Sequence, residues 1–466
     1  MSLSIKNLAS AMEDTHDCIV VGAGYAGLSA AKTLSEQGRD ILVLEARDRV
    51  GGRVWTKESP DGMYEDRGGS FLGGDHQPRM YSLAREFGIK TYDLPTRGRS
   101  IFQWKGKAKA YDAKLIPPMN PLALLESLVR LKQFDRLANQ IDVVEPWKSP
   151  NAEKLDRMTL EQWLCSNFRS RQARQALRAG FDLLLGHSAS QVSMLYVLWY
   201  CKSGVSFEVL ARVDNGAQQQ LVDGGGQSIA NAMHKQLGDK VRLSEPVVTV
   251  DQTHSDRVIV TTEKSSYTAR TVIFAIPQPL INHVSFLPPL PPQKTKLCQK
   301  SPMGSYWKIF AEYETAFWLE KGLRGDMFSP DGWVSQIYDT SPMDKSRGVI
   351  MGFVVSQKGL RFLGMSPEER RRIVLEELVV CLGEEGGKPK ALKMHTMLEE
   401  KWATGCPVAC PAPEMLTTLG EWLRKPVDRV HWAGTETSTE WMGYMEGAVS
   451  SGVRAANEVA EKLKGC

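Results

Sequence analysis

The stretch that decides the fold is Cys18-Ile-Val-Val-Gly22-Ala-Gly24-Tyr-Ala-Gly27, followed by Leu28-Ser-Ala-Ala-Lys-Thr-Leu-Ser-Glu-Gln-Gly38. An apolar run, a glycine-rich turn and a run that stops at a glycine predict a strand, a tight loop and a helix. A second apolar run, Asp40-Ile-Leu-Val-Leu-Glu45, ends in a carboxylate 18 positions after Gly27. This spacing is typical of a dinucleotide-binding unit, in which glycines let the backbone approach a pyrophosphate at the helix N-terminus.

Two short stretches after the second apolar run add to the predicted phosphate cradle. Ala46-Arg47 follows the carboxylate directly, and Gly51-Gly52-Arg53 comes soon after it. Two glycines and a cation can form a second backbone loop against the same pyrophosphate, which favours a flavin nucleotide over a nicotinamide. Glu45 is expected to accept hydrogen bonds from a ribose. The candidate cofactor-binding residues in this region are Gly22, Gly24, Ala26, Gly27, Glu45, Ala46, Arg47, Gly52 and Arg53.

Length and composition limit the other possibilities. A chain of 466 residues is too long for one ordinary core, so we expect two interleaved domains. Lys and Arg number 58 and Asp and Glu 54, without long like-charge blocks, so nucleic acid is not an expected partner. The eight cysteines are scattered, which predicts neither a disulfide framework nor a metal site and favours a reduced, cytoplasmic setting. No run approaches the roughly 20 apolar residues of a membrane span, so no stable membrane anchor is expected. The sequence leaves a homodimer open.

A second glycine-rich unit lies near the C-terminus. His431-Trp-Ala-Gly434-Thr435-Glu436-Thr437 precedes Trp441-Met-Gly443-Tyr444-Met445-Glu-Gly447-Ala. The pattern predicts a strand, a glycine turn and a helix start, whose N-terminal amides can face a ring that accepts negative charge. Together with Tyr64-Glu-Asp-Arg-Gly68-Gly69-Ser70-Phe71 and Leu221-Val-Asp-Gly224, these motifs resemble those of the flavin-containing amine oxidase family, and most closely the monoamine oxidases. The resemblance extends from about residue 18 to about residue 460.

The resemblance implies FAD as the cofactor and adds further contacts to it. Gly69 and Ser70 would lie near the flavin ring, the backbone of Val247 would meet the adenine, and Glu436 would accept from groups linked to the ribityl chain or the pyrophosphate. Cys406 matches the cysteine that monoamine oxidases link to the flavin through a thioether, whereas other members of the family hold FAD without a bond. Gly434, Thr435 and Met445 complete the implied cofactor site.

The resemblance also implies residues at the reacting carbon. Lys308, in Met303-Gly-Ser-Tyr-Trp-Lys308, matches a lysine that hydrogen-bonds a water beside flavin N5, where a buried cation favours electron transfer to O2. Tyr444 resembles one wall of an aromatic cage, and Pro407 stands where monoamine oxidases have the opposite tyrosine. Trp402 or another ring therefore replaces that wall, or the cage is one-sided. From residue type alone, Lys308 also fits a lysine that reaches solvent from a strand end, and Tyr444 an ordinary buried tyrosine. The weaker candidates are Gln218 for the substrate pocket and Tyr64 and Phe71 beside the flavin.

These segments predict an α/β fold of the amine oxidase and p-hydroxybenzoate hydroxylase type. A Rossmann-like FAD-binding domain is expected from residues 1–80, 212–300 and 405–466. An interleaved α+β substrate-binding domain is expected from residues 81–211 and 301–404, the first interval largely helical and the second with a strand over Val349-Ile-Met-Gly-Phe-Val-Val-Ser356.

The implied reaction is FAD-dependent oxidation of an amine, with a small-molecule amine and O2 as partners. A primary monoamine is the favoured substrate, giving an imine that water hydrolyses to an aldehyde and ammonia, while O2 becomes hydrogen peroxide. A polyamine, an L-amino acid or an amine of a biosynthetic pathway is the alternative, and an L-amino acid would need an arginine in the pocket for its carboxylate. A catalytically silent flavin-bound scaffold is a different class of function, and Lys308 and Tyr444 argue against it.

Overall fold

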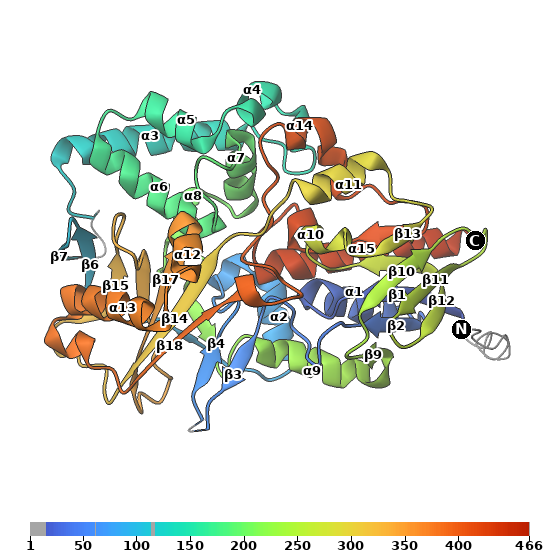
Figure 1. Cartoon of the computed structure of the whole chain (residues 1–466), viewed down its shortest axis with the longest axis horizontal. Coiled ribbons are helices and arrows are strands. Elements are labelled where there is room, and N and C mark those ends of the chain that lie inside the picture. The colour runs from blue at the N-terminus through green and yellow to red at the C-terminus, as the bar shows by residue number, and fades with distance from the viewer. Residues whose placement is uncertain (1–14, 61, 113–116, 466) are drawn as a thin grey trace.

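The computed structural model describes residues 15–60, 62–112 and 117–465, which form two large sheets with helices around them (Figure 1). The first sheet joins strands from three distant parts of the chain. At its centre β1 (Thr15–Val21) pairs in parallel with β2 (Ile41–Leu44) and β12 (Ser266–Phe274), and β12 pairs in parallel with β19 (Val430–Trp432). Its other strands are β9 (Val241–Arg242), β10 (Val247–Asp251), β11 (Val258–Thr262) and β13 (Ser285–Leu287).

The two ends of the chain pack together on this sheet. Helix α1 (Tyr25–Glu36) follows β1 directly and stops before Gly38, whose φ of +74° favours glycine. Helix α15 (Met445–Lys464) lies against α1, and a Cβ added at Gly452 would lie 2.1 Å from the Ala26 carbonyl oxygen. Helices α2 (Pro78–Glu86) and α9 (Gln227–Leu237) lie next to them (Figure 1). The predicted strand, glycine turn and helix are therefore confirmed at both ends.

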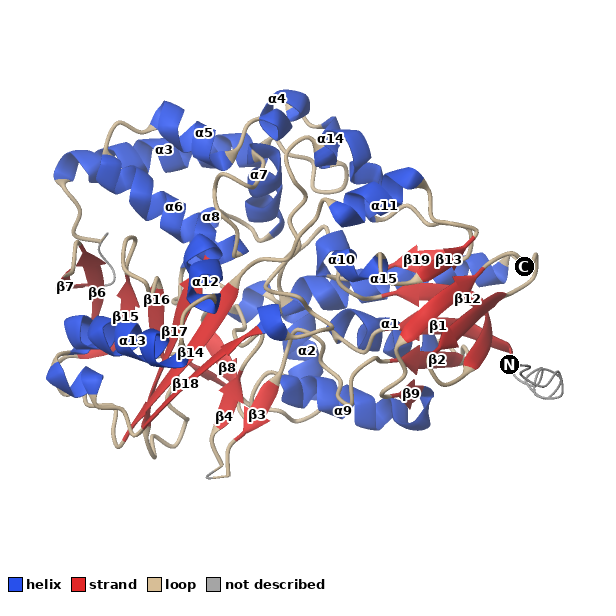
Figure 2. Cartoon of the chain, in the orientation of Figure 1, coloured by secondary structure: helices blue, strands red, loops and turns tan. Residues whose placement is uncertain are grey.

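The second sheet is almost entirely antiparallel, and Figure 2 shows it well apart from the first. Strand β14 (Tyr306–Tyr313), next to the edge strand, pairs with β17 (Gly348–Val355) and β18 (Ala391–Thr396). The remaining strands are β15 (Leu323–Phe328), β16 (Gln336–Asp339), β6 (Arg99–Trp104) and β7 (Lys107–Asp112). Helix α13 (Pro367–Leu382) buries Val374 and Leu378 in one core with Ile337 of this sheet, and α12 (Ser356–Leu363) follows β17.

A cluster of helices covers one end of the molecule (Figure 2). Its helices are α3 (Pro121–Asn139), α4 (Ala152–Arg157), α5 (Leu160–Asn167), α6 (Arg171–Leu185), α7 (Met194–Ser203) and α8 (Phe207–Ala211). The core of the cluster also takes in Leu297 of α11 (Pro292–Gln299) and Leu416 of α14 (Met415–Leu419). Shorter elements are α10 (Gln278–Ile281), the β3–β4 hairpin (Thr56–Glu58 and Tyr64–Asp66) and the β5–β8 pair (Thr91–Asp93 and Gln220–Val222).

The predicted interleaved α/β architecture is confirmed, as is the strand beginning near Val349. The expectation of a largely helical interval 81–211 holds only from α3 onward, because β6 and β7 add two strands to the second sheet. Leu297 and Leu416 belong to expected cofactor segments yet pack among the substrate-side helices, so the predicted domain boundaries stay a prediction. Within the described ranges, no helix has both the length and the apolar character needed to cross a membrane.

Candidate active site

A cavity of about 1840 Å³ connects the two halves of the molecule. It runs from the glycine turn after β1 to the inner face of the second sheet and to helices α6 and α8. Gly22 and Gly24 line one end, and Tyr306 and Phe353 line the other. Its volume exceeds that of a usual small-ligand pocket, as expected for a site that holds a dinucleotide and a substrate together.

Two glycine turns meet at the first end of the cavity. Gly24 and Gly51 form an isolated bridge, and a Cβ added at Gly52 (φ +60°) would lie 3.1 Å from the Cα of Gly24. A Cβ added at Gly27 would lie 1.8 Å from the Gly22 carbonyl oxygen, so this glycine lets α1 pack on the turn. Gly27 therefore has a packing role and does not line the cavity. The predicted residues that line it here are Gly22, Gly24, Ala26 and Gly52.

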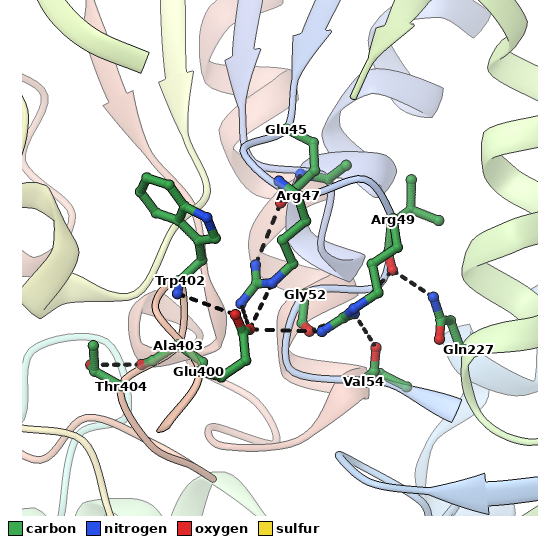
Figure 3. A network of polar contacts seen from close by, with 12 residues as sticks. Glu45, Arg47, Arg49, Gly52, Val54, Gln227, Glu400, Trp402, Ala403 and Thr404 are labelled. Carbon is green, nitrogen blue, oxygen red and sulfur yellow. Dashed lines mark hydrogen bonds and ion pairs between the residues drawn. The ribbon is translucent and has the colours of Figure 1, made fainter. Parts of the chain in front are cut away.

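Glu45 lies just beyond β2 with both carboxylate oxygens in use. Oε2 accepts the amide of Ala23 at 2.6 Å, and Oε1 accepts the amide of Arg47 at 3.0 Å. The Arg47 guanidinium contacts Glu45 (Nη1 to Oε1, 3.4 Å) and Glu400 (Nε to Oε2, 2.7 Å), as Figure 3 shows. Glu45, Ala46 and Arg47 all line the cavity, next to the glycine turn. A carboxylate at this place suits a ribose.

Arg53 and Glu436 form a buried ion pair that joins the two ends of the chain. Arg53 Nη2 donates to Glu436 Oε2 at 3.0 Å, and Nη1 donates to the other oxygen and to the Pro407 carbonyl at 2.8 Å. Burial alone would raise the pKa of Glu436, but the Arg53 guanidinium and hydrogen bonds together lower it. Arg53 lines the cavity and Glu436 does not. The direct cofactor contact expected of Glu436, and the pyrophosphate contact expected of Arg53, stay predictions.

Lys308 points from β14 into the cavity. Its Nζ donates to the Asp66 carbonyl at 2.7 Å and to the Ser70 hydroxyl. Burial lowers the pKa of Lys308 to about 8, although Asp66 acts in the opposite direction. An ammonium has three donors, so one remains for a water or a ligand. The alternative of a solvent-reaching lysine is wrong, because the residue is only 8% exposed.

His395 of β18 stands directly across from Lys308 and also lines the cavity. Burial, together with the charges of Arg67 and Lys308, lowers the pKa of His395 to about 4. The imidazole is thus neutral, and its buried Nε2 has no hydrogen-bond partner. The residue directly opposite Lys308 on β18 therefore carries no charge.

Aromatic rings form two walls at the substrate end. On one side Tyr444, the N-cap of α15, lies 5.2 Å from the Trp441 ring and 6.3 Å from the Tyr200 ring between centroids. On the other side a chain of ring contacts links Tyr306, Phe353, Tyr338 and Phe71. Each of these last four rings lines the cavity, as do Tyr200 and Tyr444. Burial raises the pKa of Tyr444 and Tyr306 well above the usual range, so both phenols are neutral.

Tyr306 occupies the neighbourhood of Pro407, where monoamine oxidases have their second tyrosine. A Cβ added at Gly186 would touch both the Tyr306 ring, at 3.0 Å, and Pro407, at 3.1 Å. Trp402 also lines the cavity, but it lies beside Glu400 in the turn drawn in Figure 3. Tyr306 is therefore a ring that lies beside the position of the missing wall.

Cys406 lines the cavity close to two cations. Its amide donates to the Gly304 carbonyl at 3.0 Å, which fixes the backbone of this segment against the start of β14. Burial raises the pKa of Cys406 to about 11, while Lys308 and Arg53 both act to lower it. A thiol beside two cations is suited to forming a thiolate when a ligand demands it.

Gln218 and Arg324 are the polar groups at the substrate end that bear on specificity. Gln218 Nε2 donates to the Leu210 carbonyl at 3.0 Å, which leaves its buried Oε1 without a partner. Arg324 lines the cavity, but its Nε donates to Asp326 Oδ1 at 2.7 Å and its Nη2 to the second oxygen. The cavity therefore offers a free hydrogen-bond acceptor and an arginine whose charge is already compensated.

The structure gathers nearly all of the predicted site residues. Besides those above, the predicted residues that line the cavity are Gly69, Ser70, Val247, Cys406, Pro407, Gly434, Thr435 and Met445. The prediction that Tyr64 lies beside the flavin is wrong, because this residue lies on hairpin strand β4 with 49% of its surface exposed. Sequence reasoning missed Tyr200, Tyr306, Tyr338, His395 and Glu400. Only Tyr306 carried a usable signal, since it lies two positions before Lys308 and so on the same face of β14.

FAD fits this cavity. The glycine turns leave backbone amides open to a pyrophosphate, Glu45 is placed for the ribose, and the N-terminus of α15 meets the cavity through Met445. A buried lysine and two aromatic walls lie beyond the cradle. These features define a flavin-dependent oxidoreductase of small organic substrates.

Comparisons with known proteins place the chain within that class. The sequence profile of flavin containing amine oxidoreductases matches residues 25–460, and the chain belongs to this family. It is 37% identical over 454 residues to a flavin-containing amine oxidase of Oncorhynchus mykiss, covering 97% of this chain and 87% of that one. It is 35% identical over 456 residues to flavin-containing amine oxidase B of Homo sapiens, with the same coverage.

Solved structures show the same similarity. Putrescine oxidase bound to putrescine superimposes with a TM-score of 0.92 at 31% identity, covering 96% of this chain and 99% of that one. Cyclohexylamine oxidase from Brevibacterium oxydans superimposes with a TM-score of 0.92 at 32% identity, covering 97% and 100%. The protein is a flavin-dependent amine oxidase that uses FAD.

Proposed function

We propose that the enzyme oxidises a primary monoamine to an imine, which water hydrolyses to an aldehyde and ammonia, while O2 is reduced to hydrogen peroxide. The observation that carries the proposal is the pair of aromatic walls beside Lys308, together with Arg324, an arginine of the cavity lining that is already bound to Asp326. The chemistry that FAD supplies when bound is acceptance of a hydride equivalent from the carbon next to nitrogen. The protein has to bind, orient and shield the amine.

The walls and the polar groups divide these tasks. Tyr444 and Tyr306 present ring faces that attract the amine nitrogen and exclude bulk water. The free Oε1 of Gln218 can accept a hydrogen bond from an N–H of the amine. Lys308 holds a positive charge beside Ser70, where it can stabilise negative charge that develops as O2 is reduced.

The compensated arginine favours an amine without a carboxylate. An L-amino acid would have to take Arg324 from Asp326 or use an arginine further out, such as Arg212, which pairs with Glu208 at 2.8 Å. Breaking such a pair leaves a carboxylate uncompensated. Putrescine oxidase and cyclohexylamine oxidase are both structural relatives, so a diamine and a cyclic monoamine belong in the same test.

A peroxidase-coupled assay with benzylamine, cyclohexylamine, putrescine and L-leucine tests the proposal. Peroxide is expected with the two monoamines. A response to putrescine alone or to L-leucine alone would overturn the substrate assignment. Anaerobic mixing with benzylamine should bleach the flavin absorbance, and a flavin that no amine in the panel bleaches would instead indicate a silent scaffold.

We further propose that FAD is bound covalently through Cys406. The thiol would lose its proton, a bond would form between Sγ and the 8α carbon of the flavin, and that carbon would lose one hydrogen. O2 takes up the two electrons and two protons released and becomes hydrogen peroxide, so the step balances. Yellow colour should stay with the acid-precipitated protein and leave the pellet in Cys406→Ser. Colour released from the wild-type protein would refute the attachment and leave amine oxidation untouched.

A further inference from the structure

Glu400 anchors a tight turn that leads into Cys406. The turn follows β18 and a short 3-10 helix (Met397–Glu399) and so leaves the second sheet for the cofactor cradle. The Glu400 carbonyl accepts the amides of Ala403 at 3.0 Å and Thr404 at 2.9 Å, and its side-chain Oε1 accepts the amide of Trp402 at 3.4 Å. One residue therefore holds three amides of the turn, as Figure 3 shows in part.

The carboxylate of Glu400 ties this turn to the cradle. Its Oε2 accepts from Arg47 Nε at 2.7 Å and from Arg47 Nη2, and Arg49 Nη2 lies 3.8 Å away. Side chains of Glu400 and Arg47 are 20% and 10% exposed, so the ion pair is largely removed from water. A paired, charge-assisted contact of this kind fixes geometry better than a single neutral hydrogen bond.

Arg47 continues the connection to the predicted ribose site. It contacts Glu45 through its amide at 3.0 Å and through Nη1 at 3.4 Å, and Glu45 accepts the amide of Ala23. The contacts run without a break from the glycine turn, through Glu45 and Arg47, to Glu400 and its turn. They cross from one sheet to the other, because Glu45 follows β2 and Glu400 follows β18.

The end of the turn, at Gly405 and Cys406, packs closely against Gly304. Gly405 (φ +139°) packs so closely that an added Cβ would lie 2.4 Å from the Gly304 carbonyl, and the Cys406 amide donates to that same oxygen. Lys401 and Trp402 of the turn line the cavity together with Cys406. Movement of Glu400 would thus move a cavity wall as well as the thiol.

We propose that Glu400 is a positioning residue for flavin attachment: its ion pair with Arg47 holds the turn so that the Cys406 thiol meets the cofactor whose ribose Glu45 binds. The inference rests on the proposed attachment through Cys406. Glu400 acts through the turn and does not touch the reacting atoms. Its loss should slow formation of the thioether more than it weakens reversible binding of FAD.

Apoprotein incubated with FAD in air tests the proposal. The fraction of flavin that stays with acid-precipitated protein is followed over time in wild type, Glu400→Gln and Glu400→Ala. Glutamine keeps the size and one acceptor, so attachment should slow about tenfold, and alanine should slow it about 10²-fold, the cost of a small misplacement at a reacting centre. Glu399→Gln is the matched control, since Glu399 is an exposed carboxylate at the adjacent position.

Reversible binding is measured separately in a Cys406→Ser background by titration of FAD fluorescence. The dissociation constant should change by less than about threefold on adding Glu400→Gln, because the glycine turns and Glu45 remain. Thermal unfolding of each apoprotein reports whether the variant is folded, and a folded Glu400→Gln suffices for the test.

Four results would overturn the proposal. Attachment in Glu400→Ala at the wild-type rate would remove the positioning role. Equal slowing in Glu399→Gln, or a loss of FAD affinity that matches the slowing in full, would show a general weakening of the site. Flavin released from wild-type protein would end both this proposal and the attachment, while peroxide formation in the amine assay would still support the proposed reaction.

Discussion

Replacing Lys308 by methionine should slow reoxidation of the reduced enzyme by O2. Methionine keeps the length of the side chain and removes the charge. The loss of one preorganised charged donor at a site of developing negative charge costs about 10²- to 10³-fold in rate. Reduction of the flavin by the amine should change much less, because the cation is not needed for that step. Stopped-flow absorbance separates the two half-reactions.

The pH dependence of the wild-type protein follows from the same residue. A pKa of about 8 means that about 90% of Lys308 is charged at pH 7 and about 10% at pH 9. The rate of reoxidation should therefore fall as pH rises through 8, approaching about tenfold per pH unit above it. His395, across the strand, stays neutral throughout this range because its pKa is lowered to about 4.

Stability of the apoprotein gives an independent check on the lowered pKa. The folded pKa of about 8 lies below the ordinary value of 10.5, so the unfolded chain binds more protons between these two pH values. The free energy of unfolding of wild type, relative to Lys308→Met, should therefore rise with pH across that window, by about 3 kcal/mol in total. Urea denaturation at pH 7.5 and higher measures it.

Lys401→Met provides the control, since Lys401 lines the cavity but stacks on Trp402, with Nζ 4.4 Å from the ring centroid. Its reoxidation rate should stay close to that of wild type. A wild-type rate that is flat between pH 7 and 9, or a Lys308→Met rate within about threefold of wild type, would refute the assigned role of the lysine.

Three further substitutions test the cradle, the ion pair and the aromatic wall. Gly27→Ala should abolish FAD retention, because the added Cβ would lie 1.8 Å from the Gly22 carbonyl oxygen. Gly364→Ala is the control and should retain FAD, because its added Cβ would lie 3.6 Å from the nearest atom. The flavin absorbance of the purified proteins measures retention. Glu436→Gln leaves Arg53 without its counter-charge and should lower the free energy of unfolding by about 3 kcal/mol in urea titrations, and a loss below about 1 kcal/mol would contradict a buried pair. Tyr444→Leu should lower kcat/KM for benzylamine about tenfold while Tyr444→Phe stays near wild type, and equal losses in both would assign the effect to the hydroxyl.

Contiguous motifs made much of this protein predictable. The stretch from Cys18 to Glu45 specifies a strand, a turn, a helix and a second strand in one continuous run, and all four occur. The C-terminal unit around Gly434 was equally readable, since it repeats the strand, the turn and the helix. The predicted fold class and most cavity residues follow from these two units.

The remainder depends on contacts between segments that are far apart in the sequence. Glu400 and Arg47 are 353 positions apart in the sequence, and the residues around each give no local pattern that predicts their ion pair. Tyr306 lies beside Pro407 only because β14 and the turn at Gly186 come together there. Tyr64 fails for a related reason: a short motif does not say which residue of a hairpin faces solvent.

The first sheet has a consequence for the synthesis of the enzyme. In it β1 pairs with β12, β12 pairs with β19, and α1 packs against α15. The first strand leaves the ribosome early, but a neighbour that completes its sheet is synthesised only when residues 430–432 appear, and the helix that closes the cradle follows at 445–464. The N-terminal strand and helix therefore lack these neighbours until β19 and α15 have been synthesised. We therefore expect FAD to bind after α15 has been synthesised, so nascent chains arrested before α15 should capture no flavin.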